Sequence, residues 1–271
     1  MDAMKVAVKW RNPRMTRFQF LTLALAIVGG LAASTVGAQA PAPPKTSGTV
    51  RAVLASTPLS SVADAPRYFK LVRVHLPTAK SVTYNGPVGF VLVLDGALEV
   101  TSGAEQRSLA KSDGLLIAEG KSTTFDSAPG KPAEFLHFVL STAGELNGPM
   151  ESPPAVVREL YRTPSPIPGL KPGPYEFTLV RVALPPRFPL NPPHRRSGAA
   201  LYYIYSGTGM FTANGKTEPR PAGVAHYEPY DLVHQWANPG DEPLVIIQAS
   251  INQEGVPAVI FVQPAGTGSS K

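Results

Sequence analysis

The stretch FKLVRVHLP at residues 69–77 returns as FTLVRVALP at residues 177–185, at an offset of 108. A second stretch, GFVLVLDG at residues 89–96, has its counterpart in ALYYIYSG at residues 200–207, in the same order and at an offset of 111. Similar segments that recur in the same order at a nearly constant offset are typical of an internal duplication. The sequence therefore predicts two copies of one domain.

The repeated stretches are runs of β-branched and aromatic residues of strand length, bounded by Gly, Pro or Ser, and similar runs occupy residues 135–140, 244–251 and 256–262. The chain of 271 residues is 43% hydrophobic, which is enough for a sizeable core, and its 30 Pro and 24 Gly supply many turns. We therefore predict an all-β protein. The one exception is residues 154–162, where an early Pro favours a short helix.

The N-terminal segment is typical of a secretory signal peptide. Arg11, Arg14 and Arg17 precede an apolar run at residues 20–31, and small residues follow that run up to Ala38. About a dozen apolar residues fall short of the roughly 20 that cross a bilayer, which argues against an uncleaved membrane anchor. We predict cleavage after Ala38 and a periplasmic or secreted mature protein.

The predicted leader carries most of the excess positive charge. The whole chain has a formal net charge of +6, whereas the part after the predicted cleavage site has +2. No basic patch remains to favour nucleic acid, and we expect no membrane association after cleavage. The absence of Cys excludes a disulfide scaffold, a Cys-based zinc site and a cysteine nucleophile. Met1 and Met15 are both candidate start residues.

A motif in the second half identifies a family. Gly223, Pro229, Asp231, His234 and Asn238 follow the pattern G-x5-P-x-D-x2-H-x3-N. This pattern resembles the second sequence motif of the cupin superfamily, in which a Gly usually stands at the position of the Asp. The resemblance implies a metal ligand at the His position.

The first cupin motif, H-x-H-x3-E-x6-G, is present only in part. His194 and Gly207 occupy its first and last positions, whereas Arg196 stands at the second His and Ala200 at the Glu. In the first half, the corresponding positions hold no residue that could bind a metal. The chain therefore resembles a secreted bicupin with degenerate metal motifs, and the resemblance covers roughly residues 49–263.

The resemblance implies two tandem jelly-roll barrels, each with an interior cavity, and it is compatible with a homodimer. We predict a signal peptide at residues 1–38, a disordered tether at 39–48, an N-terminal cupin-like barrel without metal ligands at 49–162, a Pro-rich linker at 163–174, a C-terminal cupin barrel at 175–263 and a disordered tail at 264–271.

A working cupin site holds Fe, Mn, Ni, Cu or Zn through imidazoles and a carboxylate, as the family resemblance implies. Here His194 and His234 align with ligand positions, and His226 or Glu228 on the preceding strand could complete the set. Arg196 opposes a cation there and favours an anionic ligand, unless its guanidinium turns out to solvent. His234 could equally be a histidine of the hydrophobic core, and His226 and Glu228 could instead form a cross-strand polar pair.

Strand parity adds two aromatic residues to the candidate ligand site. Trp236 shares a face with His234, and Tyr202 shares a face with the expected Glu position. Together with Arg196, His194 and His234 they form the predicted ligand-binding set.

Three functions remain open: binding of a small, anionic molecule with weak or no catalysis, a metal-dependent cupin enzyme such as a dioxygenase, decarboxylase or isomerase, and a structural partner for another protein. Fold alone does not choose among them.

Overall fold

The computed structural model describes residues 48–60, 62–148 and 150–262, all within one unit that spans Pro43–Lys271. The predicted signal peptide, the tether up to residue 47 and the tail at 264–271 lie outside the described residues. Within these ranges every regular element is a strand, so the all-β prediction is confirmed. No helix in the described part is long and apolar enough to cross a membrane.

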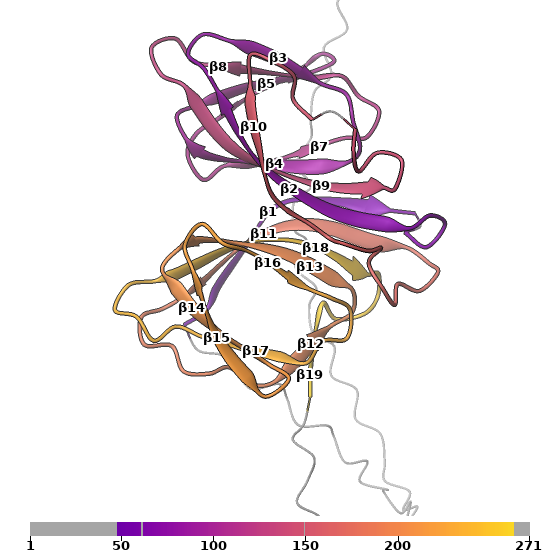
Figure 1. Cartoon of the computed structure of the whole chain (residues 1–271), viewed down its shortest axis with the longest axis vertical. Coiled ribbons are helices and arrows are strands. Elements are labelled where there is room, and N and C mark those ends of the chain that lie inside the picture. The colour runs from indigo at the N-terminus through magenta and orange to yellow at the C-terminus, as the bar shows by residue number, and fades with distance from the viewer. Residues whose placement is uncertain (1–47, 61, 149, 263–271) are drawn as a thin grey trace, which may run out of the picture. The chain divides into compact units, whose positions relative to one another are not determined.

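Two antiparallel sheets form the first half (Figure 1). One sheet has the strand order β10-β2-β9-β4-β7 and the other β3-β8-β5-β6. Their bounds are β2 Arg67–Leu76, β3 Ser81–Tyr84, β4 Gly89–Asp95, β5 Leu98–Ser102, β6 Glu105–Leu109, β7 Gly114–Ile117, β8 Thr123–Ser127, β9 Ala133–Thr142 and β10 Val156–Arg162.

The second half repeats this plan with the orders β1-β11-β18-β13-β16 and β15-β14-β17-β12-β19. The bounds are β1 Val50–Leu59, β11 Tyr175–Leu184, β12 His194–Arg196, β13 Ala199–Ser206, β14 Thr208–Ala213, β15 Lys216–Pro221, β16 Ala225–Glu228, β17 His234–Ala237, β18 Leu244–Gln253 and β19 Val259–Phe261. The repeated sequence stretches fall on β2 and β11 and on β4 and β13, so the duplicated jelly-roll architecture is confirmed.

Alternate residues of each repeated strand serve two different cores. On β2, Val72 and Val74 pack inside the first barrel, whereas Phe69 and Leu71 join a cluster that also contains Phe177 of β11. This division follows from the period of two in a strand, which sends successive side chains to opposite faces. One sheet of each half is therefore buried on both faces.

Strand β1 lies in the range predicted for the first barrel but is hydrogen-bonded into the sheet of the second. It runs antiparallel to β11 from Val50 opposite Ala183 to Leu59 opposite Tyr175, with a bulge between Val53 and Ala55. Since β1 has a partner on one side only, it forms an edge of the second barrel. The division into domains at residue level stays a prediction.

The helix predicted for residues 154–162 is wrong. Residues Val156–Arg162 form β10, which pairs antiparallel with β2. Val156 and Val157 are β-branched and gain little in a short helix, whereas pairing satisfies the backbone groups along the otherwise open edge of β2. The tertiary partner thus overrides the local preference.

Candidate functional site

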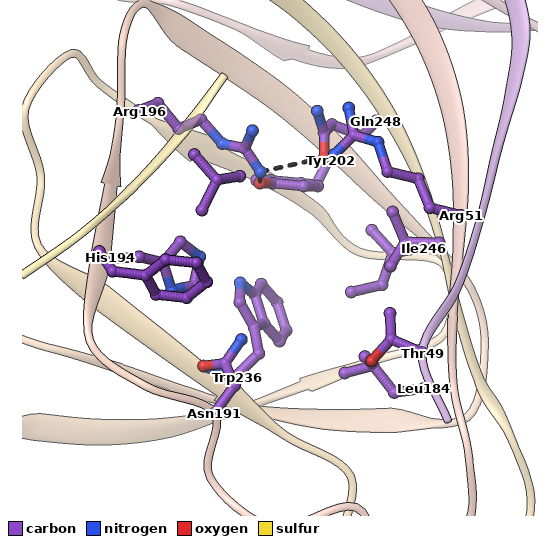
Figure 2. A pocket seen from close by; sticks show the side chains of 13 residues that line it. Thr49, Arg51, Leu184, Asn191, His194, Arg196, Tyr202, Trp236, Ile246 and Gln248 are labelled. Carbon is purple, nitrogen blue, oxygen red and sulfur yellow. Dashed lines mark hydrogen bonds between the residues drawn. The ribbon is translucent and has the colours of Figure 1, made fainter. Parts of the chain in front are cut away.

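A cavity of about 230 Å³ lies inside the second barrel (Figure 2). Its polar lining consists of Thr49, Arg51, Asn191, His194, Arg196 and Gln248. Apolar side chains from β11, β17, β18 and β19 make up most of the remaining wall. Strands β1 and β19 are the last strands of their sheets and both contribute to the lining, so the cavity lies where the two sheet edges meet.

A buried ion pair stands at one end of this cavity. Nε of Arg196 donates to Oε2 of Glu228 at 2.8 Å, and Nη2 donates to Oε1 of Gln248 at 3.0 Å. The same Nη2 contacts the hydroxyl of Tyr202, which in turn donates to Oε2 of Glu228. Arg196 is 5% exposed, so the alternative in which its guanidinium turns to solvent does not hold.

Glu228 is the centre of this cluster, because both of its oxygens are engaged. Oε1 accepts a hydrogen bond from Nε1 of Trp236 at 2.9 Å and lies 3.1 Å from Nε2 of His234. The contact with His234 is within ion-pair distance but lacks hydrogen-bond geometry. Burial works to raise the pKa of Glu228, but His234 and Arg196 outweigh it and hold this pKa well below its usual value. The carboxylate is therefore ionised.

The two motif histidines lie side by side on paired strands. His194 on β12 is opposite His234 on β17, and their ring centroids are 4.3 Å apart. Each ring donates through Nδ1 to a backbone carbonyl at 2.9 Å, that of Pro192 or of Leu232. Because a carbonyl only accepts, these bonds fix the proton on Nδ1 in both rings. Burial, followed by the nearby His234, lowers the pKa of His194 to about 4.

His226 lies at the edge of this group. It stands opposite Tyr202 on the neighbouring strand, its ring packs edge-on against Phe211 at 4.1 Å, and its Nδ1 accepts from Nε of Arg220 at 3.2 Å. Burial lowers its pKa to about 4, which keeps the ring neutral near pH 7. His226 and Glu228 both approach Trp236, as the alternation along β16 predicts.

Comparison with known proteins identifies the fold family. The family model described as "Cupin domain" matches residues 180–250, a range that contains most of the residues that line the cavity. The solved structure of oxalate decarboxylase from Bacillus subtilis, a protein with Mn(II) centres, has a TM-score of 0.52 at 14% sequence identity. It covers 81% of this chain and 82% of its own. Residues 180–250 match the cupin domain, and the chain has the cupin fold.

Two further cupin-fold structures are similar at lower scores. AerE from Microcystis aeruginosa has a TM-score of 0.49 at 17% identity, covering 74% of this chain and 99% of its own. A salicylate 1,2-dioxygenase from Pseudaminobacter salicylatoxidans has a TM-score of 0.48 at 10% identity, covering 67% and 70%. Among curated protein sequences none matches this chain.

The donor set of this cupin barrel does not fit a resident transition metal. Arg196, Tyr202, Trp236 and His234 already surround the carboxylate of Glu228, so it has no free position for a metal. That leaves two imidazoles, whereas a durable open site needs about three protein ligands. No group of three or more His, Cys, Asp or Glu residues suited to a metal occurs in the part of the chain that the structure describes.

Motif residues of the cupin signature that face away from the cavity have structural roles. Asp231 has a φ of 64° and Gly223 one of 88°, which explains why the cupin pattern usually has Gly at both positions. Asn238 donates through Nδ2 to the carbonyls of Leu184, Pro185 and Glu242, and so fastens the loop after β17. The match to the cupin motif therefore reflects the backbone and loop requirements of the barrel as much as the chemistry of a ligand site.

The sequence analysis missed several residues of the cavity, among them Gln248 and Arg51. Gln248 interrupts the apolar run of β18, and its position between Ile247 and Ala249 is a signal that alternation could have revealed. Arg51 offers no such signal, because it reaches the cavity only through the pairing of β1 with β11, opposite Val182. Figure 2 shows its side chain extending toward the end of the cavity where Gln248 lies.

The first barrel contains a buried polar pair that the sequence did not predict. Nδ1 of His137 on β9 lies 2.5 Å from Oε1 of Glu151, and both side chains are fully buried. By contrast Thr83, at a first-motif ligand position, is exposed, and the strand from Phe90 to Val93 is wholly apolar and buried. The expected lack of a cupin ligand set in this barrel stays a prediction.

Proposed function

We propose that the second barrel binds a small organic anion, a carboxylate, in the cavity beside Arg196. The single observation that carries this proposal is a pair of guanidinium groups on one small cavity. Arg196 is compensated by Glu228, yet its buried Nη1 has no hydrogen-bond partner among the described residues. Arg51 also lines the cavity, and no described residue forms an ion pair or hydrogen bond with its side chain.

Charge and shape both support an anion. The pair Arg196–Glu228 is close to neutral, so Arg51 leaves the cavity with one uncompensated positive charge. A carboxylate suits guanidinium groups because it accepts parallel hydrogen bonds from them. Leu184, Ile246 and Trp236 provide an apolar wall for the organic part of the ligand. A volume of about 230 Å³ limits that part to a small molecule.

Calorimetric titration of the full chain with short alkanoates and their matched neutral amides tests this proposal. We expect the carboxylate to bind at least about tenfold more tightly than its amide, because one charge-assisted hydrogen bond contributes about that much affinity. Arg51→Gln should lower the carboxylate affinity by about the same factor. Arg181→Gln is the matched control, because Arg181 lies on the adjacent strand, opposite Ala52, and is exposed away from the cavity. Equal binding of acid and amide contradicts the proposal.

A chelator separates this proposal from a metal-dependent function. The proposed site uses guanidinium donors, so EDTA should leave the alkanoate affinity unchanged. If EDTA abolishes binding and Zn²⁺ or Mn²⁺ restores it, a metal holds the ligand and the proposal is wrong. Tryptophan fluorescence gives a second readout, since Trp236 lines the cavity; Trp236→Phe identifies the background from Trp10, the other tryptophan of the chain.

Export through the N-terminal leader and a homodimeric state remain proposals that this site does not bear on. Both come from the sequence: the leader from its arginines and apolar run, and the dimer from the family resemblance. Fractionation of cells that produce the full chain tests the first, and light scattering tests the second.

A further inference from the structure

A second cavity, of about 400 Å³, lies further along the same inner sheet face. Arg51 lines both cavities. The register explains this arrangement: Arg51 is opposite Val182 on β11, which lines the first cavity, and Val53, two residues further along β1, lines the second. Side chains two apart on a strand share a face, so β1 joins the two cavities.

The second cavity offers hydrogen-bond acceptors. Asn252 on β18 is 5% exposed; its Nδ2 donates to Oγ of Ser250 at 3.2 Å, whereas its Oδ1 is buried without a partner among the described residues. Glu176, opposite Asn252 on β11, and Glu254 bring two carboxylates to the same cavity. A buried acceptor without a donor is costly, so this site is incomplete without a ligand that donates.

Charge changes sign between the two cavities. The first has the guanidinium groups of Arg196 and Arg51, and the second has the carboxylates of Glu176 and Glu254. Arg51 lies between the two groups of charges, because it lines both cavities. An anionic group therefore fits one end and a cationic group the other.

We propose that the natural ligand is an elongated amino carboxylate, with its carboxylate between Arg51 and Arg196 and its ammonium at Asn252 and Glu176. This inference rests on the proposed function and specifies the class of its ligand. An ammonium group has three donors and no acceptor, which matches the unpartnered Oδ1 of Asn252 and the carboxylate of Glu176. Gln248 and Asn252 are four residues apart on β18, so the two ends of the ligand are separated by about 13 Å.

Matched pairs of ligands test the inference by calorimetry on the full chain. We expect 8-aminooctanoate to bind about tenfold more tightly than octanoate, the gain of one hydrogen bond to a charged group. The gain should be absent for 4-aminobutanoate against butanoate, because the shorter chain does not span the two cavities. Asn252→Leu should remove the gain, measured as the ratio of the affinities for 8-aminooctanoate and octanoate in the same variant.

A second variant keeps the test decisive if Asn252→Leu does not fold. Glu176 is exposed, and Glu176→Gln should reduce the gain several-fold without affecting the fold. If octanoate and 8-aminooctanoate bind equally well to the unaltered protein, the inference is overturned while the carboxylate proposal stands. If neither binds, the proposed function itself fails. A gain that persists in both variants places the ammonium elsewhere and also overturns the inference.

Discussion

At the scale of single residues, the chemistry of the site depends on where its carboxylate comes from. The first cupin motif has Ala200 at the position of its Glu and Arg196 at the position of its second His. Glu228 stands directly opposite Ala200 on the neighbouring strand, so it returns a carboxylate to almost the same place. Arg196 then binds this carboxylate, and we propose that the same guanidinium also favours an anionic ligand.

The buried histidines predict how stability depends on pH. His194 and His226 have folded-state pKa values of about 4, below the ordinary 6.5. As the pH falls from 6.5 toward 4, the unfolded chain binds these protons and the folded protein does not, so the free energy of unfolding decreases. We expect a loss of about 2–3 kcal/mol for each ring over this window. Glu228 adds to the loss only below pH 4.5, its unfolded value.

Urea unfolding at pH 7.5 and pH 4.5 measures this effect. The difference between the two free energies of unfolding should shrink in His194→Gln and His226→Gln. His75→Gln is the control, because His75 is exposed on β2 and its replacement should leave the difference as it is. An equal pH dependence in all four proteins would contradict the assignment.

At the scale of elements, β1 matters because it belongs to the first half by sequence and to the second by pairing. It also packs against β7, where a Cβ added at Gly114 would lie 2.8 Å from Cδ2 of Leu179 and 3.1 Å from Cβ of Leu54. Only a residue without a side chain lets β7 approach this closely. We therefore expect the position of Arg51, and with it the proposed anion site, to depend on a glycine in the other half.

Gly114→Val tests this dependence. We expect a loss of about 1–3 kcal/mol in stability from overpacking, together with a several-fold loss in carboxylate affinity because β1 moves. Thermal unfolding and calorimetry measure the two effects. Gly144→Ala is the control, since no atom lies within 4 Å of a Cβ there. If Gly114→Val loses stability but keeps full affinity, β1 does not transmit the change to the cavity.

At the scale of the whole molecule, one hydrophobic cluster joins residues from both halves. Its buried members include Phe69 and Phe90 from the first half and Phe177 and Leu201 from the second. The rings of Phe90 and Phe177 have centroids 4.4 Å apart. Because each half loses part of its core when this cluster opens, we expect the two halves to unfold cooperatively.

Hydrogen exchange in aromatic deletions tests this cooperativity. Phe177→Ala should cost about 3–5 kcal/mol and lower amide protection in both halves. Phe125→Ala removes an equally buried ring from a cluster that contains only first-half residues, and it should lower protection mainly there. If Phe177→Ala affects β11, β13 and β18 alone, the shared cluster does not couple the halves.

The sequence by itself determined the duplication, the all-β class and the inward faces of the strands, because these depend on local periodicity. Tyr202, Trp236 and His234 could be assigned to one interior for that reason. Only the tertiary structure decided that β1 crosses to the second barrel, that residues 156–162 form a strand, and that Glu228 neutralises Arg196. Alternation fixes which face a side chain occupies, whereas the choice of partner strand depends on pairing between segments far apart in the chain.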